Sequence, residues 1–189
     1  SQLTNLSVSS PFSLNDTTGT GIQSATNTAS GNYSIAMGSS TSAIGTASTS
    51  MGIDSEATGA ISLATGNGTS ATGQSSFSGG EYSEASGRNS ISFGSVTKAS
   101  GIESTAFGKN TLASGARATA FGNGSLASGI TATAFGSSTA SGNSSFAVGN
   151  STASGDGSIA LLNADASGAE SVAIGRTVMA EGQWSIALG

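Results

Sequence analysis

A glycine returns along this chain at nearly constant intervals, and this spacing limits the possible folds more than any other feature. Seven equal steps separate the first eight of these glycines, called coil glycines below; three steps that are one residue shorter follow, and the last step regains the original length. An alanine stands two places before each, and a second glycine seven places after each, except where Leu162 takes that place. Self-similarity at a fixed period is the signature of a repeat architecture. The coil glycines are Gly31, Gly45, Gly59, Gly73, Gly87, Gly101, Gly115, Gly129, Gly142, Gly155, Gly168 and Gly182.

Between the glycines, residues alternate with a period of two, as in "SIAMG", "SFAVG" and "SVAIG". Alternation is typical of β-strands. A helix is excluded because glycines recurring this often would cost about 1 kcal/mol each relative to alanine. Each unit therefore predicts a strand, a turn, a second short strand through the alanine, and another turn. One such coil cannot bury an apolar face alone, so the sequence predicts an all-β solenoid of about twelve stacked coils.

Stacking places the equivalent residues of successive repeats directly above one another, one strand spacing of about 4.8 Å away. We expect the larger apolar residues to line the inside of the coils as ladders, with alanine on the opposite strand leaving room for them. This predicted inner-core ladder comprises Ile91, Phe93, Phe107, Phe121, Phe135, Phe146, Val148, Ile159, Leu161, Val172, Ile174, Ile186 and Leu188. Thr105, Thr119 and Thr133 occupy the same alternating slots and are expected to point inward too.

The other side of the first strand carries serine and alanine, which would make a small, flat, uncharged surface. Such a surface would let neighbouring chains approach closely. This candidate contact face, called the serine–alanine face below, comprises Ser34, Ala36, Ser90, Ser104, Ala106, Ser171 and Ala173.

Three local features of the repeat give further expectations. Glu84 with Lys98, and Glu103 with Arg117, are one full repeat apart and should face each other on neighbouring coils, which favours the stacked register. The glycines should supply turn conformations with positive φ. The three shorter steps lose one residue from a turn, which predicts a local change of turn type.

Composition excludes most chemistry. The 189 residues include no His and no Cys, which removes the commonest general base and metal ligand and all thiolate chemistry. The sequence pI of about 4.3 argues against binding to nucleic acid. Gly-rich stretches lack the Lys-Ser/Thr of a phosphate loop, and the Asp-rich calcium repeat is missing around "NADASG". We expect no catalytic site, no cofactor and no metal.

Four of the five cations lie between residues 88 and 117, in the main charged band of a nearly neutral repeat. We interpret this band as a candidate contact zone for a partner. Its residues are Tyr82, Glu84, Arg88, Lys98, Glu103, Lys109 and Arg117. Tyr33 and Trp184 are further candidates for exposed contact residues.

The motifs "NYSIAMG", "ESVAIG" and "WSIALG" resemble the YadA-like head of trimeric autotransporter adhesins, whose repeat is close to N-S-V-A-I-G at a period near 14. The resemblance covers residues 28–189. It implies a left-handed parallel β-roll, assembled side by side as a homotrimer and displayed on the bacterial cell surface beyond the outer membrane. It also implies virulence-related adhesion to host matrix proteins such as collagen, fibronectin or laminin, or to a cell receptor.

The expected organisation is an irregular N-terminal cap over residues 1–27, with a degenerate coil near Gly21, followed by head repeats over residues 28–189. The family's neck, coiled-coil stalk and membrane anchor are not found, so we expect a head fragment that makes no membrane contact itself. Alternatives are self-association between cells in biofilms, and an ice-binding solenoid. A hexapeptide-repeat enzyme ranks last because its period of six does not match.

Overall fold

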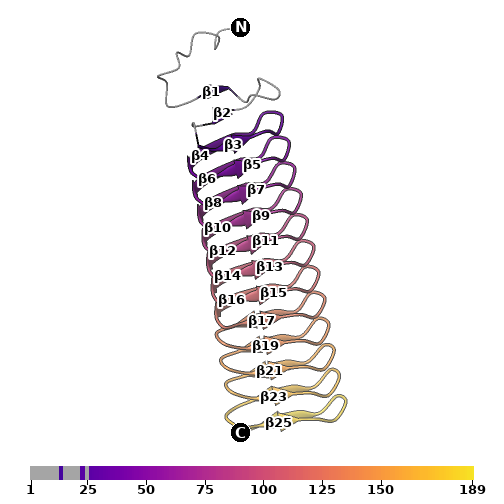
Figure 1. The fold of residues 1–189 in the computed structure, drawn as a ribbon. Coiled ribbons are helices and arrows are strands. Elements are labelled where there is room, and N and C mark those ends of the chain that lie inside the picture. Colours follow the sequence, from indigo (N-terminus) through magenta and orange to yellow (C-terminus); the bar gives the residue numbers. More distant parts are fainter. Residues whose placement is uncertain (1–12, 15–21, 24–25) are drawn as a thin grey trace.

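The computed structural model describes residues 13–14, 22–23 and 26–189, and these residues form a parallel β-solenoid of about twelve coils. The coils stack as a straight column from the N-terminal to the C-terminal end (Figure 1). Each coil contributes one strand to a fourteen-stranded sheet, called sheet A, and one to a twelve-stranded sheet, called sheet B. Within the described residues there is no helix.

Sheet A holds the longer strands. They are β1 (Ser13–Leu14), β2 (Ile22–Gln23), β4 (Ile35–Ser39), β6 (Thr49–Ile53), β8 (Leu63–Asn67), β10 (Phe77–Glu81), β12 (Ile91–Ser95), β14 (Thr105–Lys109), β16 (Thr119–Asn123), β18 (Thr133–Phe135), β20 (Phe146–Val148), β22 (Ile159–Leu161), β24 (Val172–Ile174) and β26 (Ile186–Leu188).

Sheet B holds strands of two residues, each ending on the alanine that precedes a coil glycine. They are β3 (Thr28–Ala29), β5 (Ser42–Ala43), β7 (Glu56–Ala57), β9 (Ser70–Ala71), β11 (Glu84–Ala85), β13 (Lys98–Ala99), β15 (Leu112–Ala113), β17 (Leu126–Ala127), β19 (Thr139–Ala140), β21 (Thr152–Ala153), β23 (Asp165–Ala166) and β25 (Met179–Ala180).

The register of the parallel ladders confirms the expected stacking. Phe93 pairs with Phe107 and Phe107 with Phe121, each one coil further on. At the N-terminal end, β2 pairs in parallel with β4, whereas β1 pairs antiparallel with β2. The expected irregular cap and the degenerate coil at Gly21 fall mostly outside the described residues.

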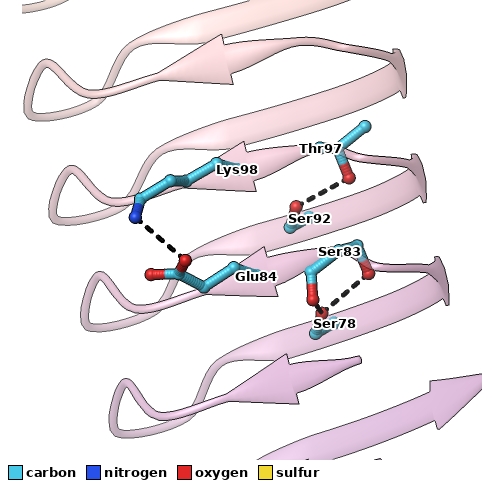
Figure 2. A network of polar contacts seen from close by, with 6 residues as sticks. All are labelled: Ser78, Ser83, Glu84, Ser92, Thr97 and Lys98. Carbon is cyan, nitrogen blue, oxygen red and sulfur yellow. Dashed lines mark hydrogen bonds and ion pairs between the residues drawn. The ribbon is translucent and has the colours of Figure 1, made fainter. Parts of the chain in front are cut away.

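The interior of the solenoid is lined by alanine, serine and threonine. In β14, Ala106 is completely buried, and across the coil Thr111 and Ala113 are buried against it. Serine and threonine hydroxyls pair inside some coils, between Ser78 and Ser83 at 2.8 Å and between Ser92 and Thr97 at 2.8 Å (Figure 2). The two strands of one coil therefore leave room only for small side chains.

This narrow interior overturns the predicted direction of the side chains. The predicted inner-core ladder lies on the outer face of sheet A, where Phe93, Phe107 and Phe121 are 38%, 40% and 45% exposed. The other members of that ladder also face outward and are exposed or half-buried, namely Ile91, Phe135, Phe146, Val148, Ile159, Leu161, Val172, Ile174, Ile186 and Leu188. The space between the two strands of a coil explains this, because it is filled by alanine and serine side chains and is too small for a phenylalanine ring.

The prediction that the serine–alanine face is the contact face of the homotrimer was wrong for the same reason. Its members fill the interior and are 0% exposed, so they are unavailable to a neighbouring chain: Ser34, Ala36, Ser90, Ser104, Ala106, Ser171 and Ala173. In some coils the serine three places after a coil glycine fastens a turn, whereas the hydroxyls of Ser104 and Ser171 have no hydrogen-bond partner. Ser90 Oγ donates a hydrogen bond to the carbonyl oxygen of Gly87 at 2.6 Å and so fastens the turn.

The coil glycines are required by close approach and not by φ. They lack the expected positive φ, but a Cβ at Gly101 would overlap the carbonyl oxygen of Gly115 in the next coil. The second glycines of the longer coils do adopt positive φ, for example 127° at Gly108. The expectation of positive φ was thus right for this second set only.

The turns of the three shorter coils do change type, as expected. Gly136 with Ser137, Gly149 with Asn150, and Leu162 with Asn163 are pairs of consecutive residues with φ between 60° and 74°. Two successive left-handed residues define the type I′ turn, which is shorter than the turn it replaces. Leu162 therefore holds a conformation that normally selects glycine.

Candidate functional site

The outer face of sheet A is an apolar strip that runs the length of the described solenoid. Parallel pairing places equivalent residues of successive coils in columns, so one large residue per coil repeats along the strip. The rings of Phe93 and Phe107 stack with centroids 5.4 Å apart, and those of Phe107 and Phe121 with centroids 5.0 Å apart. The stack continues at a tilt to Phe77 at one end and Phe135 at the other. A contiguous exposed apolar strip is typical of interaction surfaces, so this strip is the candidate site.

A second column lies beside the phenylalanines on the same face. It includes Thr105, Thr119 and Thr133, which pair in register and are half-buried on the outside of the sheet. The expectation that these threonines point inward was wrong. The column of smaller threonines thus runs beside the stacked rings of Phe107 and Phe121.

Two rows of turns border the apolar strip. The leading ridge consists of the two residues that follow each coil glycine, just before the strand of sheet A. The trailing ridge consists of the second glycine of each coil and the two residues after it. Many residues on both ridges are left-handed, among them Ile61 with φ of 60° and Val96 with φ of 56°. Sequence reasoning missed these exposed apolar residues, because no glycine or asparagine signals their conformation.

The charged band does not converge into one site. Glu84 and Lys98 face each other on sheet B, where Lys98 Nζ lies 2.9 Å from Glu84 Oε2 (Figure 2). This pair is confirmed. Arg88, Glu103 and Arg117 lie on the leading ridge, whereas Tyr82 and Lys109 lie on the trailing ridge, across the width of a strand. Glu103 and Arg117 form no ion pair, since Glu84–Lys98 is the only ion pair among the residues described.

Tyr33 and Trp184 are exposed, as expected, at 70% and 68%. Both occupy the leading ridge, and Trp184 Nε1 donates a hydrogen bond to Glu170 Oε2 at 2.8 Å, one coil earlier. A similar side-chain ladder joins Ile130, Asn143 and Asp156, through hydrogen bonds from the backbone N–H of one coil to the side-chain oxygen of the next. These hydrogen bonds therefore join successive coils of the leading ridge between residues 130 and 184.

Chemistry-bearing clusters are missing from the described part of the chain. No group of three or more acidic residues there is positioned to hold a metal ion. The "NADASG" segment uses Asn163 structurally, since its Oδ1 accepts a hydrogen bond from Asn150 Nδ2 at 2.6 Å. Over residues 26–189 and the two short strands before them, no helix has the length and apolar character needed to cross a membrane.

The fold is a parallel β-solenoid with an apolar strip along one face and a ridge of turns on either side of it. Comparison with protein families places it further: the model of the YadA head domain repeat matches residues 25–41, 85–111, 99–125, 113–139 and 140–161. The chain therefore carries a YadA-like head domain. The YadA head domain family is a family of structural adhesin domains and not of enzymes. A search of curated proteins gave no significant match.

Proposed function

We propose that this chain is the head of a trimeric autotransporter adhesin, in which three left-handed rolls pack side by side with the outer faces of sheet A turned toward a common axis. The observation that carries the proposal is the half-exposed ladder of Phe93, Phe107 and Phe121. Soluble monomers rarely leave a contiguous apolar strip of this extent in water. The YadA-like head repeats support the same assembly.

In this trimer, sheet B faces outward and carries the adhesive surface. Its outward columns repeat once per coil and again in each of three chains, so many weak contacts can act together. The Glu84–Lys98 pair is the charged part of that surface. The partner is a host matrix protein such as collagen, fibronectin or laminin, a cell-surface receptor, or another adhesin on a neighbouring cell. The head acts at the bacterial surface, beyond the outer membrane.

Ice binding is the weaker alternative. The outward direction of Thr105, Thr119 and Thr133 favours it, since a hydroxyl column does reach the surface. Successive threonines in this column are nevertheless confined to three coils and lie beside phenylalanines. Thr49 stands apart from them, and the residues at the other positions include Phe77 and Ile91. A surface mixed in this way does not offer the extended hydroxyl array that ordered water would need.

The function is tested by binding of the purified chain to immobilised collagen, fibronectin and laminin, together with aggregation of cells that display it. A matched variant carries Phe107→Ser and Phe121→Ser, which would prevent assembly without altering sheet B. The native chain should bind or aggregate cells, and the variant should lose at least tenfold in apparent affinity because avidity is lost. Equal binding by both, or none by a native trimer, would contradict the proposal.

A further inference from the structure

We propose that the leading ridge of each copy meets the trailing ridge of the next around the trimer, and that Glu103 pairs there with Lys109 of the neighbouring copy. This inference rests on the proposed trimer. It specifies which edges of neighbouring copies meet and how their coils align. The two ridges border the apolar strip on opposite sides, so burying the strip at a common axis brings ridges of adjacent copies together. A closed ring uses heterologous contacts, in which one edge of a subunit meets the other edge of its neighbour.

The charges of the two ridges complement each other coil by coil. Glu103 on the leading ridge and Lys109 on the trailing ridge belong to the same coil, and so do Glu170 and Arg176. Because a ring axis parallel to the solenoid keeps each coil level with its copies, these opposite charges meet between chains. Along residues 26–189, no coil carries charges of the same sign on both ridges.

Neighbouring levels contribute a third match. Arg88 on the leading ridge lies one coil, about 4.8 Å along the column, beyond Glu81 on the trailing ridge and carries the opposite charge. The remaining ridge charges, Asp54, Arg117 and Asp156, face neutral residues at their own level. The two level pairs favour an assembly in register, since a slip of one coil would set Lys109 level with Arg117 or, in the other direction, with Arg88.

None of these complementary pairs is satisfied within one chain. The path from Glu103 to Lys109 runs mostly along the extended strand β14, which places their backbones about 20 Å apart. Both residues are exposed, and the only ion pair among the described residues is Glu84–Lys98 on sheet B. Glu170 accepts the hydrogen bond from Trp184 with one carboxylate oxygen, which leaves the other for Arg176 of a neighbour.

The charged ridges and the apolar strip then have different roles in assembly. Exposed charges in complementary rows steer association and set the register more than they raise affinity. The apolar strip supplies the affinity through burial. An apolar strip with a repeat along its length could otherwise slide by one coil and still bury similar residues, whereas the ridge charges penalise that slip.

Disulfide crosslinking tests the contact directly because the chain has no cysteine. A disulfide requires Cα atoms roughly 4.4–6.8 Å apart, so Glu103→Cys with Lys109→Cys cannot bridge within one chain. Under mild oxidation this double variant should form covalent trimers on non-reducing gels. The matched control, Glu103→Cys with Arg176→Cys, uses the same two ridges five coils apart and should remain uncrosslinked.

The mass of each variant before oxidation separates this inference from the proposed function. A trimer whose Glu103→Cys/Lys109→Cys form does not crosslink would leave the trimeric head standing and overturn the ridge pairing. A trimer that crosslinks equally in the control would overturn the register. A monomeric mass would contradict both proposals together.

Discussion

Ala106 and Phe107 are neighbours in β14 and lie on opposite faces of sheet A, with Ala106 at 0% and Phe107 at 40% exposure. Their arrangement reverses the usual distribution of size, since the small residue fills the interior and the large one faces outward. It follows from a short coil whose two strands are separated only by small side chains. Every function argued for this chain depends on that reversal.

The first prediction concerns this thin interior. Ala106→Leu should destabilise the chain by about 2 kcal/mol or more, because a well-packed interior has no volume for three extra carbons. Urea unfolding at fixed protein concentration measures the change. Thr105→Val, on the outer face of the same strand, is the control and should change stability by less than about 1 kcal/mol. Similar stability of Ala106→Leu and the native chain would mean that the interior is wider than described.

A second prediction tests why the coil glycines recur. Gly101→Ala should cost about 3 kcal/mol or more, since its Cβ would overlap the backbone of Gly115 and force two coils apart. Gly124→Ala is the matched control, because Gly124 has φ of 71° but nothing within 4 Å of a Cβ. There the cost should be about 1 kcal/mol, from the left-handed conformation alone. Equal losses in the two variants would refute the close-approach explanation.

The type I′ turn at Leu162 gives a third prediction. Leu162→Gly should stabilise the chain by about 0.5–1 kcal/mol, because the left-handed strain of leucine is removed and a side chain that is 61% exposed loses little burial. Leu161→Gly, at the preceding position in β22, should instead destabilise it by about 1 kcal/mol or more. Thermal unfolding of the two variants distinguishes these signs, and a loss of stability in Leu162→Gly would show that its side chain is packed.

Much of this architecture was predictable because it depends on period alone. The spacing of the coil glycines indicated the solenoid, the register and the parallel pairing, and the separation by one full repeat indicated the Glu84–Lys98 contact. Alternation shows that a strand has two faces but not which face is inside. Ala106 and Phe107 were therefore assigned in reverse, from the general preference of large apolar residues for interiors.

Two signals in the sequence could have corrected that assignment. Alanine before every coil glycine, and glycine at nearly every coil turn, both indicate backbones in close contact and hence a thin coil. The left-handed turns at Leu162 and Val96 had no such signal, since neither is a residue that this conformation favours. The failure of Glu103 and Arg117 to pair likewise depends on side-chain direction on a turn, which spacing does not fix.

A fourth prediction concerns the ion pair on sheet B. Lys98→Ala should change stability by no more than about 1 kcal/mol, because the side chains are 48% and 38% exposed and water screens the attraction. A double-mutant cycle with Glu84→Ala isolates the coupling, which should shrink further at about 1 M salt. A coupling well above about 1 kcal/mol that persists in salt would mean that the pair is buried by a neighbouring chain.

The most direct test of the central claim, that the outer face of sheet A is buried between copies, is the solution mass of the chain by light scattering across a range of concentrations. The account predicts a mass of three times 18.0 kDa for the native chain and a lower mass for Phe107→Ser with Phe121→Ser. A native chain that stays folded and soluble at 18.0 kDa at every concentration would contradict it.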